Sequence, residues 1–155
     1  MSALYEGGCV CGAIRYRLNG EPLTLYACHC TDCQALGGGA FRLSMPALRR
    51  TVEVTQGALE RASYTPVGGA PKHGSRCAAC STWLWGEPAR LPQVVILRPG
   101  TLRDRSWLDP VAHIWVSSAQ PWVRIPEGAL VFQKQPPDDL ELVRAWKAKH
   151  PGQER

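Results

Sequence analysis

Seven cysteines fall into three tight groups, and this spacing predicts that they bind metal ions as thiolates. The groups are the pair Cys9 and Cys11, the triplet Cys28, Cys30 and Cys33, and the pair Cys77 and Cys80. An odd number of cysteines argues against a set of disulfide bonds. Cysteines that served only as small apolar core residues would be scattered. Because thiolates are preferred ligands of zinc, we expect zinc sites.

The two pairs have the spacing of a closed zinc site. Cys77 and Cys80 form a Cys-x-x-Cys motif, in which a tight turn brings two sulfurs onto one ion. Cys9 and Cys11 are two residues apart, so in an extended segment they share a face. Together the pairs supply the four ligands of a structural site, and metal binding there adds to the free energy of folding.

The triplet has the spacing of an open site. Cys28 and Cys30 share a face of an extended segment, and a helical turn from Thr31 would bring Cys33 to the same side. Three ligands leave one position of a tetrahedral zinc free for chemistry. We therefore expect two zinc ions, with the second site open to partial occupancy. A rival arrangement, in which the triplet mixes with either pair and leaves spare thiols, fits the spacing too.

Two polar residues lie inside the triplet. His29 should point to the opposite face from Cys28 and Cys30, so we expect it to orient a ligand or to bond a backbone carbonyl rather than to bind zinc. Asp32 is expected to cap the local helical turn, because thiolate sites need no carboxylate.

Alternating apolar and polar residues predict a mainly β domain around the cysteines. Strands are expected at residues 13–18, 23–27, 41–43, 51–55, 59–64, 83–85, 94–97 and 113–116. A loop rich in proline and glycine is expected at 65–74. The short helix that starts at Thr31 should end at Gly37.

A C-terminal helix is expected at about residues 138–149. Proline and aspartate at 136–138 are a helix start signal, and Leu140, Val143 and Trp146 form an apolar stripe after it. This stripe should pack the helix on the sheet.

Composition and charge narrow the classes of function. The 155 residues carry a formal net charge of +5, with 45% hydrophobic residues, as in one ordinary globular domain. The basic residues are scattered, so no nucleic-acid-binding face is expected. The first seven residues lack the pattern of a signal peptide, and no stretch approaches the roughly 18 apolar residues of a membrane helix. We expect a cytoplasmic protein with reduced thiols and without nucleic acid or membrane as a partner.

Several motifs resemble the family of glutathione-dependent formaldehyde-activating enzymes, also called the centromere protein V family. They lie at residues 7–16, 28–34, 37–39, 76–80, 108–110, 113–115 and 119–122. The resemblance covers roughly residues 5–135, and all seven cysteines fall on its motif positions. Where the family usually has phenylalanine before the Cys-x-x-Cys motif and glycine after it, this chain has Arg76 and Ser81.

The resemblance implies a β-tent fold built around a structural zinc, in a single zinc-binding domain over residues 1–155. The structural zinc would be held by Cys9, Cys11, Cys77 and Cys80, and a catalytic zinc by Cys28, Cys30 and Cys33. The implied reaction joins glutathione to formaldehyde as S-(hydroxymethyl)glutathione, formally that of a carbon–sulfur lyase. Glutathione or another small thiol is the implied partner.

Two histidines are candidates for contacts to the substrate. His29 lies beside the metal cysteines, and His113 lies in one of the motif-like segments. Two other functions fit the same motifs. One is a non-catalytic thiol-binding or carrier protein with the same zinc sites. The other is a zinc-stabilised interaction module, which would need a basic or aromatic patch that the sequence does not show.

Overall fold

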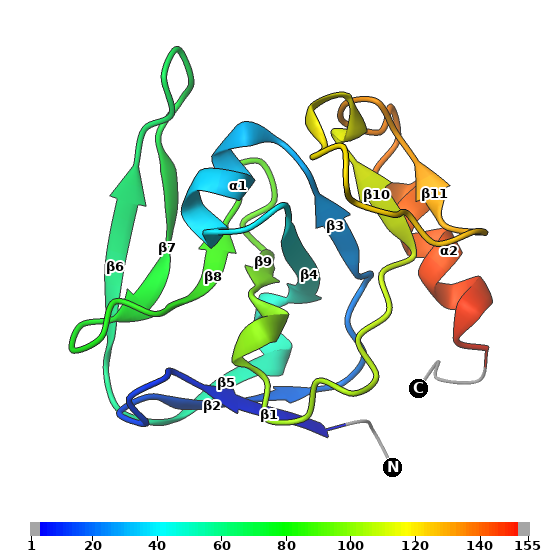
Figure 1. Ribbon diagram of the computed structural model, residues 1–155. Coiled ribbons are helices and arrows are strands. Elements are labelled where there is room, and N and C mark those ends of the chain that lie inside the picture. Colours follow the sequence, from blue (N-terminus) through cyan, green and yellow to red (C-terminus); the bar gives the residue numbers. More distant parts are fainter. Residues whose placement is uncertain (1–3, 152–155) are drawn as a thin grey trace.

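Strands make up most of the regular structure in the computed structural model, which describes residues 4–151 (Figure 1). In chain order the elements are β1 (Leu4–Gly8), β2 (Arg15–Asn19), β3 (Tyr26–Cys28), α1 (Thr31–Gly37), β4 (Arg42–Leu48), η1 (Arg49–Thr51), β5 (Val52–Gln56), β6 (Leu59–Tyr64), β7 (Lys72–Cys77), β8 (Trp83–Glu87), β9 (Val94–Leu97), η2 (Pro99–Thr101), β10 (Ala112–Ile114), η3 (Val116–Ser118), β11 (Leu130–Val131) and α2 (Leu140–Lys149). The fold is mainly β with a short C-terminal helix, as the sequence predicts.

The strands form two sheets. The smaller has the order β1-β2-β5 and lies at the bottom of Figure 1. The larger has eight strands in the order β11-β10-β3-β4-β9-β8-β7-β6. Its strands pair antiparallel from β3 to β6, whereas β10 runs parallel to both β3 and β11. The central strands β3, β4 and β9 therefore hold the residues around the triplet in a fixed register.

The small sheet closes the core through the alternation in β2. Tyr16 and Leu18 are buried, while Arg15 and Arg17 between them are exposed, as the sequence pattern predicts. Tyr16 packs edge-on against Trp85 of the large sheet, with ring centroids 5.9 Å apart. One continuous apolar cluster thus joins the two sheets.

One strand lies partly inside the segment predicted to be a loop. β7 begins at Lys72, and it pairs with β6 and β8 on its two sides. Gly74 is needed within this strand, because a Cβ there would lie 2.6 Å from a ring carbon of Trp83 and 2.4 Å from the carbonyl oxygen of Trp85. The glycine that suggested a loop marks a close approach of neighbouring chains instead.

A second difference concerns the strand predicted at 113–116. β10 ends at Ile114, because Trp115 adopts a left-handed backbone with φ 58°, and η3 follows. A left-handed residue cannot continue a strand.

The C-terminal helix buries a different stripe from the predicted one. Leu140 is 61% exposed, whereas Leu142 and Trp146 are buried at 3% and 4%. Trp146 was predicted correctly, but its buried partner is the residue four positions earlier rather than Val143. Thr24 anchors this turn, since its hydroxyl donates to the carbonyl oxygen of Leu142 at 2.9 Å. Within residues 4–151, neither helix has the length and apolar character that crossing a membrane requires.

The two leucines of α2 give a matched test of this packing. Leu142→Ala should lower the free energy of unfolding by about 2–5 kcal/mol, because it opens a cavity in the core. Leu140→Ala should change it by less than about 0.5 kcal/mol, because that side chain is exposed. Urea unfolding followed by fluorescence measures both. A loss at Leu140 as large as that at Leu142 would contradict the exposure of Leu140 in this fold.

Candidate metal centres

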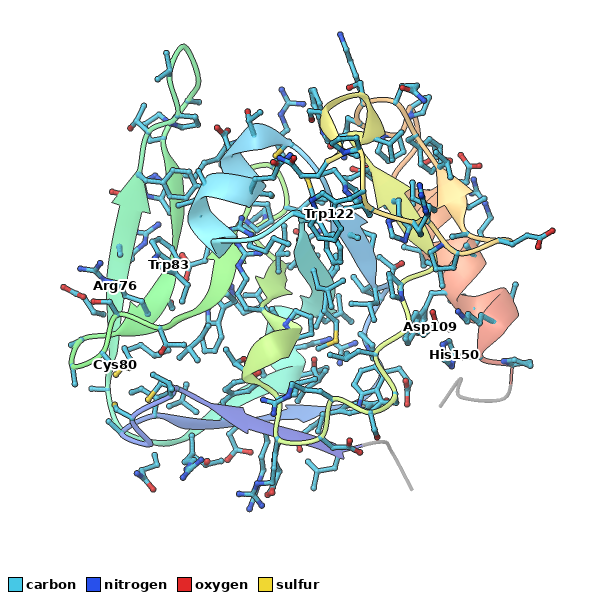
Figure 2. All side chains as sticks on the ribbon, in the orientation of Figure 1. Arg76, Cys80, Trp83, Asp109, Trp122 and His150 are labelled. Atoms are coloured by element: carbon cyan, nitrogen blue, oxygen red, sulfur yellow. The ribbon has the colours of Figure 1, made fainter. Side chains whose placement is uncertain are left out.

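Four cysteines converge where the turn after β1 meets the turn after β7. The sulfur atoms of Cys9, Cys11, Cys77 and Cys80 all lie within 4.8 Å of one another. Two of the separations are 3.5 Å, from Cys9 to Cys11, and 3.8 Å, from Cys11 to Cys77. A tetrahedral zinc with bonds of about 2.3 Å places its sulfurs about 3.8 Å apart. The four thiols therefore fit a zinc ion, and Cys80 is seen at the lower left of Figure 2.

Hydrogen-bond donors around this cluster favour the thiolate form of Cys9 and Cys80. The backbone N–H of Ile14 donates to Cys9 Sγ at 3.2 Å. The Thr82 hydroxyl lies 3.1 Å from Cys80 Sγ, and together with backbone donors it lowers the pKa of Cys80 to about 5. Because metal binds the deprotonated sulfur, these donors prepare the site for a cation.

Ser81 keeps the turn that a glycine would normally make. Its φ is 60°, in the left-handed region, and its N–H donates to the carbonyl oxygen of Cys77 at 2.9 Å. A side chain in this conformation costs roughly 1–2 kcal/mol. Ser81 thus adopts the left-handed turn conformation that glycine, the usual residue of the family pattern here, takes most easily.

Three further cysteines converge between β3 and α1. Cys28 ends β3, Cys30 is the N-cap of α1 and Cys33 lies in its first turn. Their sulfurs lie within 4.8 Å of one another, and no fourth ligating side chain joins the group within residues 4–151. Cys30 Sγ accepts a hydrogen bond from the Cys33 N–H at 3.4 Å, so Cys30 supplies the cap that was expected from Asp32.

The three thiols of the triplet differ in pKa. A hydrogen bond between Cys28 and Cys33 raises the pKa of Cys28 and lowers that of Cys33 to about 6. The positive charges of Arg42 and Arg98 lower the pKa of Cys33 further. A thiolate at Cys33 is therefore favoured near neutral pH, as a metal ligand requires.

Two polar side chains hold the backbone of the triplet in place. The carbonyl oxygen of His29 accepts hydrogen bonds from Gln34 Nε2 at 2.7 Å and from the Ser118 hydroxyl at 2.9 Å. Gln120 in turn donates to Gln34 Oε1 at 2.8 Å. None of these three side chains was predicted from the sequence to take part in the site. Gln34 lies within a family-like motif, but no sequence signal pointed to Ser118.

The structure places His29 and His113 together, on the other face of the sheet. His29 Nε2 lies 2.9 Å from His113 Nδ1, and both rings are buried. Burial lowers the pKa of each histidine. Register pairs His113 with Ala27 and Ile114 with Cys28, so His113 and Cys28 lie on opposite faces. Direct contact of these histidines with substrate stays a prediction.

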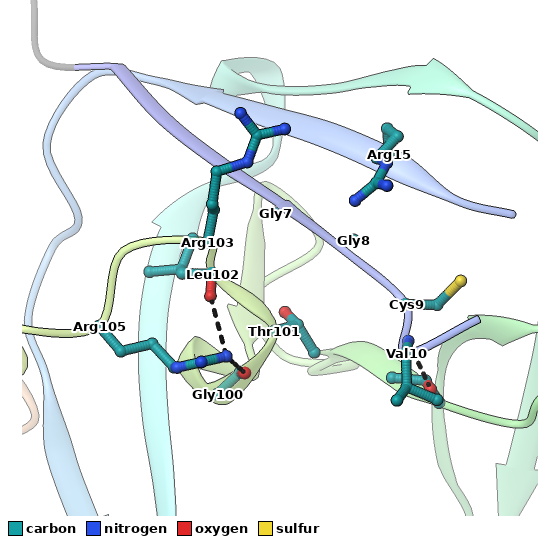
Figure 3. Close-up of a pocket in the computed structure, with 11 residues that line it drawn as sticks. Gly7, Gly8, Cys9, Val10, Arg15, Gly100, Thr101, Leu102, Arg103 and Arg105 are labelled. Carbon is teal, nitrogen blue, oxygen red and sulfur yellow. Dashed lines mark hydrogen bonds between the residues drawn. The ribbon is translucent and has the colours of Figure 1, made fainter. Parts of the chain in front are cut away.

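A surface pocket of ≈ 270 Å³ lies beside the four-cysteine cluster (Figure 3). Gly7, Gly8 and Cys9 form one side of it, and η2 with Arg103 forms another. None of the triplet cysteines lines it. This pocket is therefore separate from the three-cysteine cluster.

The two clusters should respond differently to loss of one sulfur. Cys77→Ala should lower the thermal midpoint strongly and reduce the yield of folded protein, because a closed metal site contributes folding free energy. Cys30→Ala should leave a folded protein with about one zinc fewer. Elemental analysis and thermal unfolding measure both effects. If Cys30→Ala unfolds the chain while Cys77→Ala is harmless, the two roles are reversed.

Comparison with known proteins agrees with this geometry. The sequence model of the glutathione-dependent formaldehyde-activating enzymes matches residues 4–118. A Halomonas elongata protein that carries the provisional name glutathione-dependent formaldehyde-activating enzyme is 32% identical over 97 residues, which are 59% of this chain and 61% of that protein. The match thus spans less than two thirds of the relative.

A solved structure supports the fold alone. The crystal structure of a Rhodobacter sphaeroides protein matches 66% of this chain and 91% of its own, with a TM-score of 0.51 and 18% identity. The family match covers well over half of the residues and includes both cysteine clusters. The chain therefore belongs to the glutathione-dependent formaldehyde-activating enzyme family.

Proposed function

We propose that this protein is a zinc-dependent carbon–sulfur lyase that joins glutathione to formaldehyde at the three-cysteine cluster. The observation that carries the proposal is the grouping of Cys28, Cys30 and Cys33 within 4.8 Å, without a fourth ligating side chain in residues 4–151. In the reaction, the thiol sulfur bonds to the aldehyde carbon, the carbonyl π bond breaks, and the thiol proton ends on oxygen. The product is S-(hydroxymethyl)glutathione, and the reverse reaction cleaves the same bond.

The chain's own residues would hold and orient the reacting thiol. Zinc bound by the triplet would supply a lowered thiol pKa at its open position. The Cys33 N–H donates to Cys30 Sγ and so fixes the direction of that sulfur. Gln34 and Ser118 fix the intervening backbone through the His29 carbonyl. Positioning of two reactants can by itself give large rate gains.

The same assignment extends to the four-cysteine cluster, the fold and the two histidines. We propose that zinc at Cys9, Cys11, Cys77 and Cys80 is structural, because it would tie β1 to β7 across the fold. We propose the β-tent arrangement for the whole chain, as one domain over residues 1–155, and a cytoplasmic location where its thiols stay reduced. We propose that His29 and His113 influence the site, and their direct contact with substrate stays a prediction.

A non-catalytic thiol-binding or carrier protein is the second candidate. The position of the two histidines favours it, because His113 lies on the opposite face of the sheet from Cys28. A general acid or base must come within hydrogen-bond reach of the reacting atoms. The two functions differ in turnover and not in ligands.

Exchange NMR on mixtures of glutathione and formaldehyde separates these functions. Zinc-loaded protein should speed adduct formation at least several-fold over the uncatalysed rate, and Cys30→Ala should abolish the gain. Leu140→Ala, at an exposed site far along the chain, should keep it. A wild-type rate equal to that of the protein-free control would leave only the binding function.

A further inference from the structure

Arg42 lies directly across the strand pair from a cysteine of the triplet. The register of β3 and β4 pairs Cys28 with Arg42 and Tyr26 with Ser44. Residues that are directly opposite share a face, with their Cβ atoms about 5 Å apart. The stem of Arg42 also packs beside the end of α1, since a Cβ built on Gly37 would lie 3.6 Å from Arg42 Cβ. The stem of Arg42 is thus held between the sheet and the helix that carries Cys33.

Arg98 reaches the same space from the end of β9. Its guanidinium lies over Gly86 of β8, where an added Cβ would be 3.3 Å from Arg98 Nη2. Burial, together with the charge of Arg42, lowers the pKa of Arg98 to about 10. Leu97 pairs with Met45 of β4, so Arg98 continues this register toward Ser44, two residues from Arg42. Two cations therefore stand close to each other and to the triplet.

Neither of these arginines forms a side-chain hydrogen bond or a carboxylate ion pair in the described part of the chain. The Nε atoms of Arg42 and Arg98 are buried without a hydrogen bond, and no carboxylate of residues 4–151 forms an ion pair with either. Native proteins rarely leave buried charged donors without a partner, because such a donor loses its hydration without a compensating contact. The unpaired state points to a ligand that completes it.

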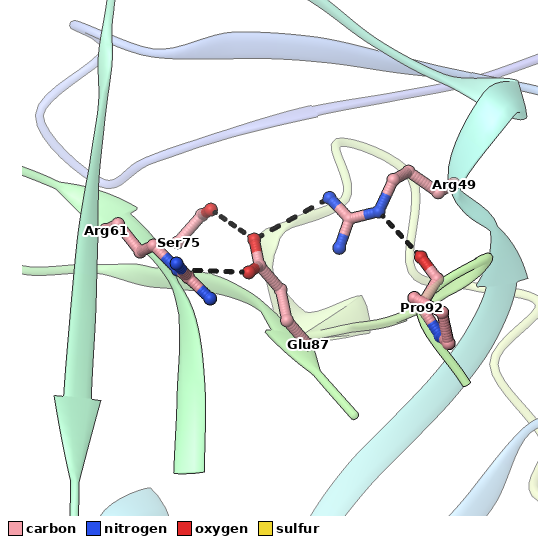
Figure 4. A network of polar contacts seen from close by, with 5 residues as sticks. All are labelled: Arg49, Arg61, Ser75, Glu87 and Pro92. Atoms are coloured by element: carbon pink, nitrogen blue, oxygen red, sulfur yellow. Dashed lines mark hydrogen bonds and ion pairs between the residues drawn. The ribbon is translucent and has the colours of Figure 1, made fainter. Parts of the chain in front are cut away.

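Several arginines elsewhere in the fold are paired. Arg49 and Arg61 both lie within 4 Å of the carboxylate of Glu87, which Ser75 also contacts (Figure 4). At the pocket in Figure 3, Arg105 donates to two backbone carbonyls. Arg103 there pairs with Glu6 at 2.9 Å. Arg42 and Arg98 beside the triplet differ from these arginines, because they are half-buried and their Nε atoms lack a hydrogen-bond partner.

Charge balance leaves room for an anion at this place. Three thiolates and one divalent cation carry one net negative charge, so one of the two guanidinium groups keeps no counter-charge before a ligand arrives. A guanidinium presents parallel N–H donors that match a carboxylate, and the low dielectric of a half-buried site strengthens that contact.

We propose that Arg42 and Arg98 form a carboxylate-binding subsite that holds an acidic thiol with its sulfur at the three-cysteine cluster. This rests on the proposed function, because glutathione carries two carboxylates and one thiol. The subsite selects acidic thiols over neutral ones. It also fixes the direction in which the bound sulfur faces the aldehyde.

Binding of glutathione and of an ester that lacks its carboxylate charges tests the subsite. Zinc-loaded wild type, Arg42→Gln and Arg98→Gln are titrated calorimetrically with glutathione and with glutathione dimethyl ester, without formaldehyde. Each variant should weaken glutathione about 10- to 100-fold, the range expected for lost hydrogen bonds to a charged group. Ester binding should change by less than about two-fold. Arg50→Gln, an exposed arginine outside the site, should change neither.

The outcomes separate this subsite from the proposed function. Equal weakening of both thiols would show that the arginines only balance the charge of the thiolates, and would overturn the subsite even if the enzyme turns over. Charge-selective weakening without any turnover would uphold the subsite and remove the enzyme claim.

Folding and zinc content are checked on each variant. Replacing an unpaired buried cation should leave the thermal midpoint equal or higher, and zinc content unchanged. If Arg98→Gln cannot be purified folded, Arg98→Lys takes its place and is compared with Arg42→Gln. Because lysine keeps the positive charge, Arg98→Lys should retain part of the wild-type selectivity for glutathione over its ester. If neither variant loses its preference for glutathione over the ester, the proposal is contradicted.

Discussion

Thiolates repel one another, so two groups of them can persist at separations under 4.8 Å only if a cation or shared protons hold them. The rest of the structure depends on this constraint. The four-cysteine group joins the turn after β1 to the turn after β7, which are far apart in sequence. A metal there would close a long loop and add its binding free energy to folding. The three-cysteine group is built from one short segment, so its loss would disturb less of the fold.

The two faces of the central strands carry different groups of residues around the triplet. One face carries Cys28 and its cross-strand neighbour Arg42, beneath the helix that carries Cys33. The other face carries the buried pair of His29 and His113. Because side chains alternate along a strand, neighbouring residues lie in separate environments. The charged face has the features of a binding site, whereas the histidine face ties β3 to β10.

The grouping of Cys28, Cys30 and Cys33 and the short helix from Thr31 to Gly37 were predictable, because their signals are local. The spacing also favoured the four-cysteine grouping, but a rival pairing stayed open, because its two pairs are far apart in the chain. The long-range pairings that bring in other residues were not predictable. Arg98 reaches the triplet only because β9 pairs with β4, and Ser118 only because β10 pairs with β3. Gly74 and Leu142 were misjudged for the same reason, since a neighbouring tryptophan and the position of a helix on the core decide their environments.

Zinc K-edge X-ray absorption on the fully loaded protein, before and after glutathione, tests the central claim most directly. One closed and one open site predict an average of about 3.5 sulfur ligands per zinc, which should rise to about 4 when the thiol binds. An average that does not rise with glutathione, or a nitrogen ligand that fills the open position beforehand, would contradict the account.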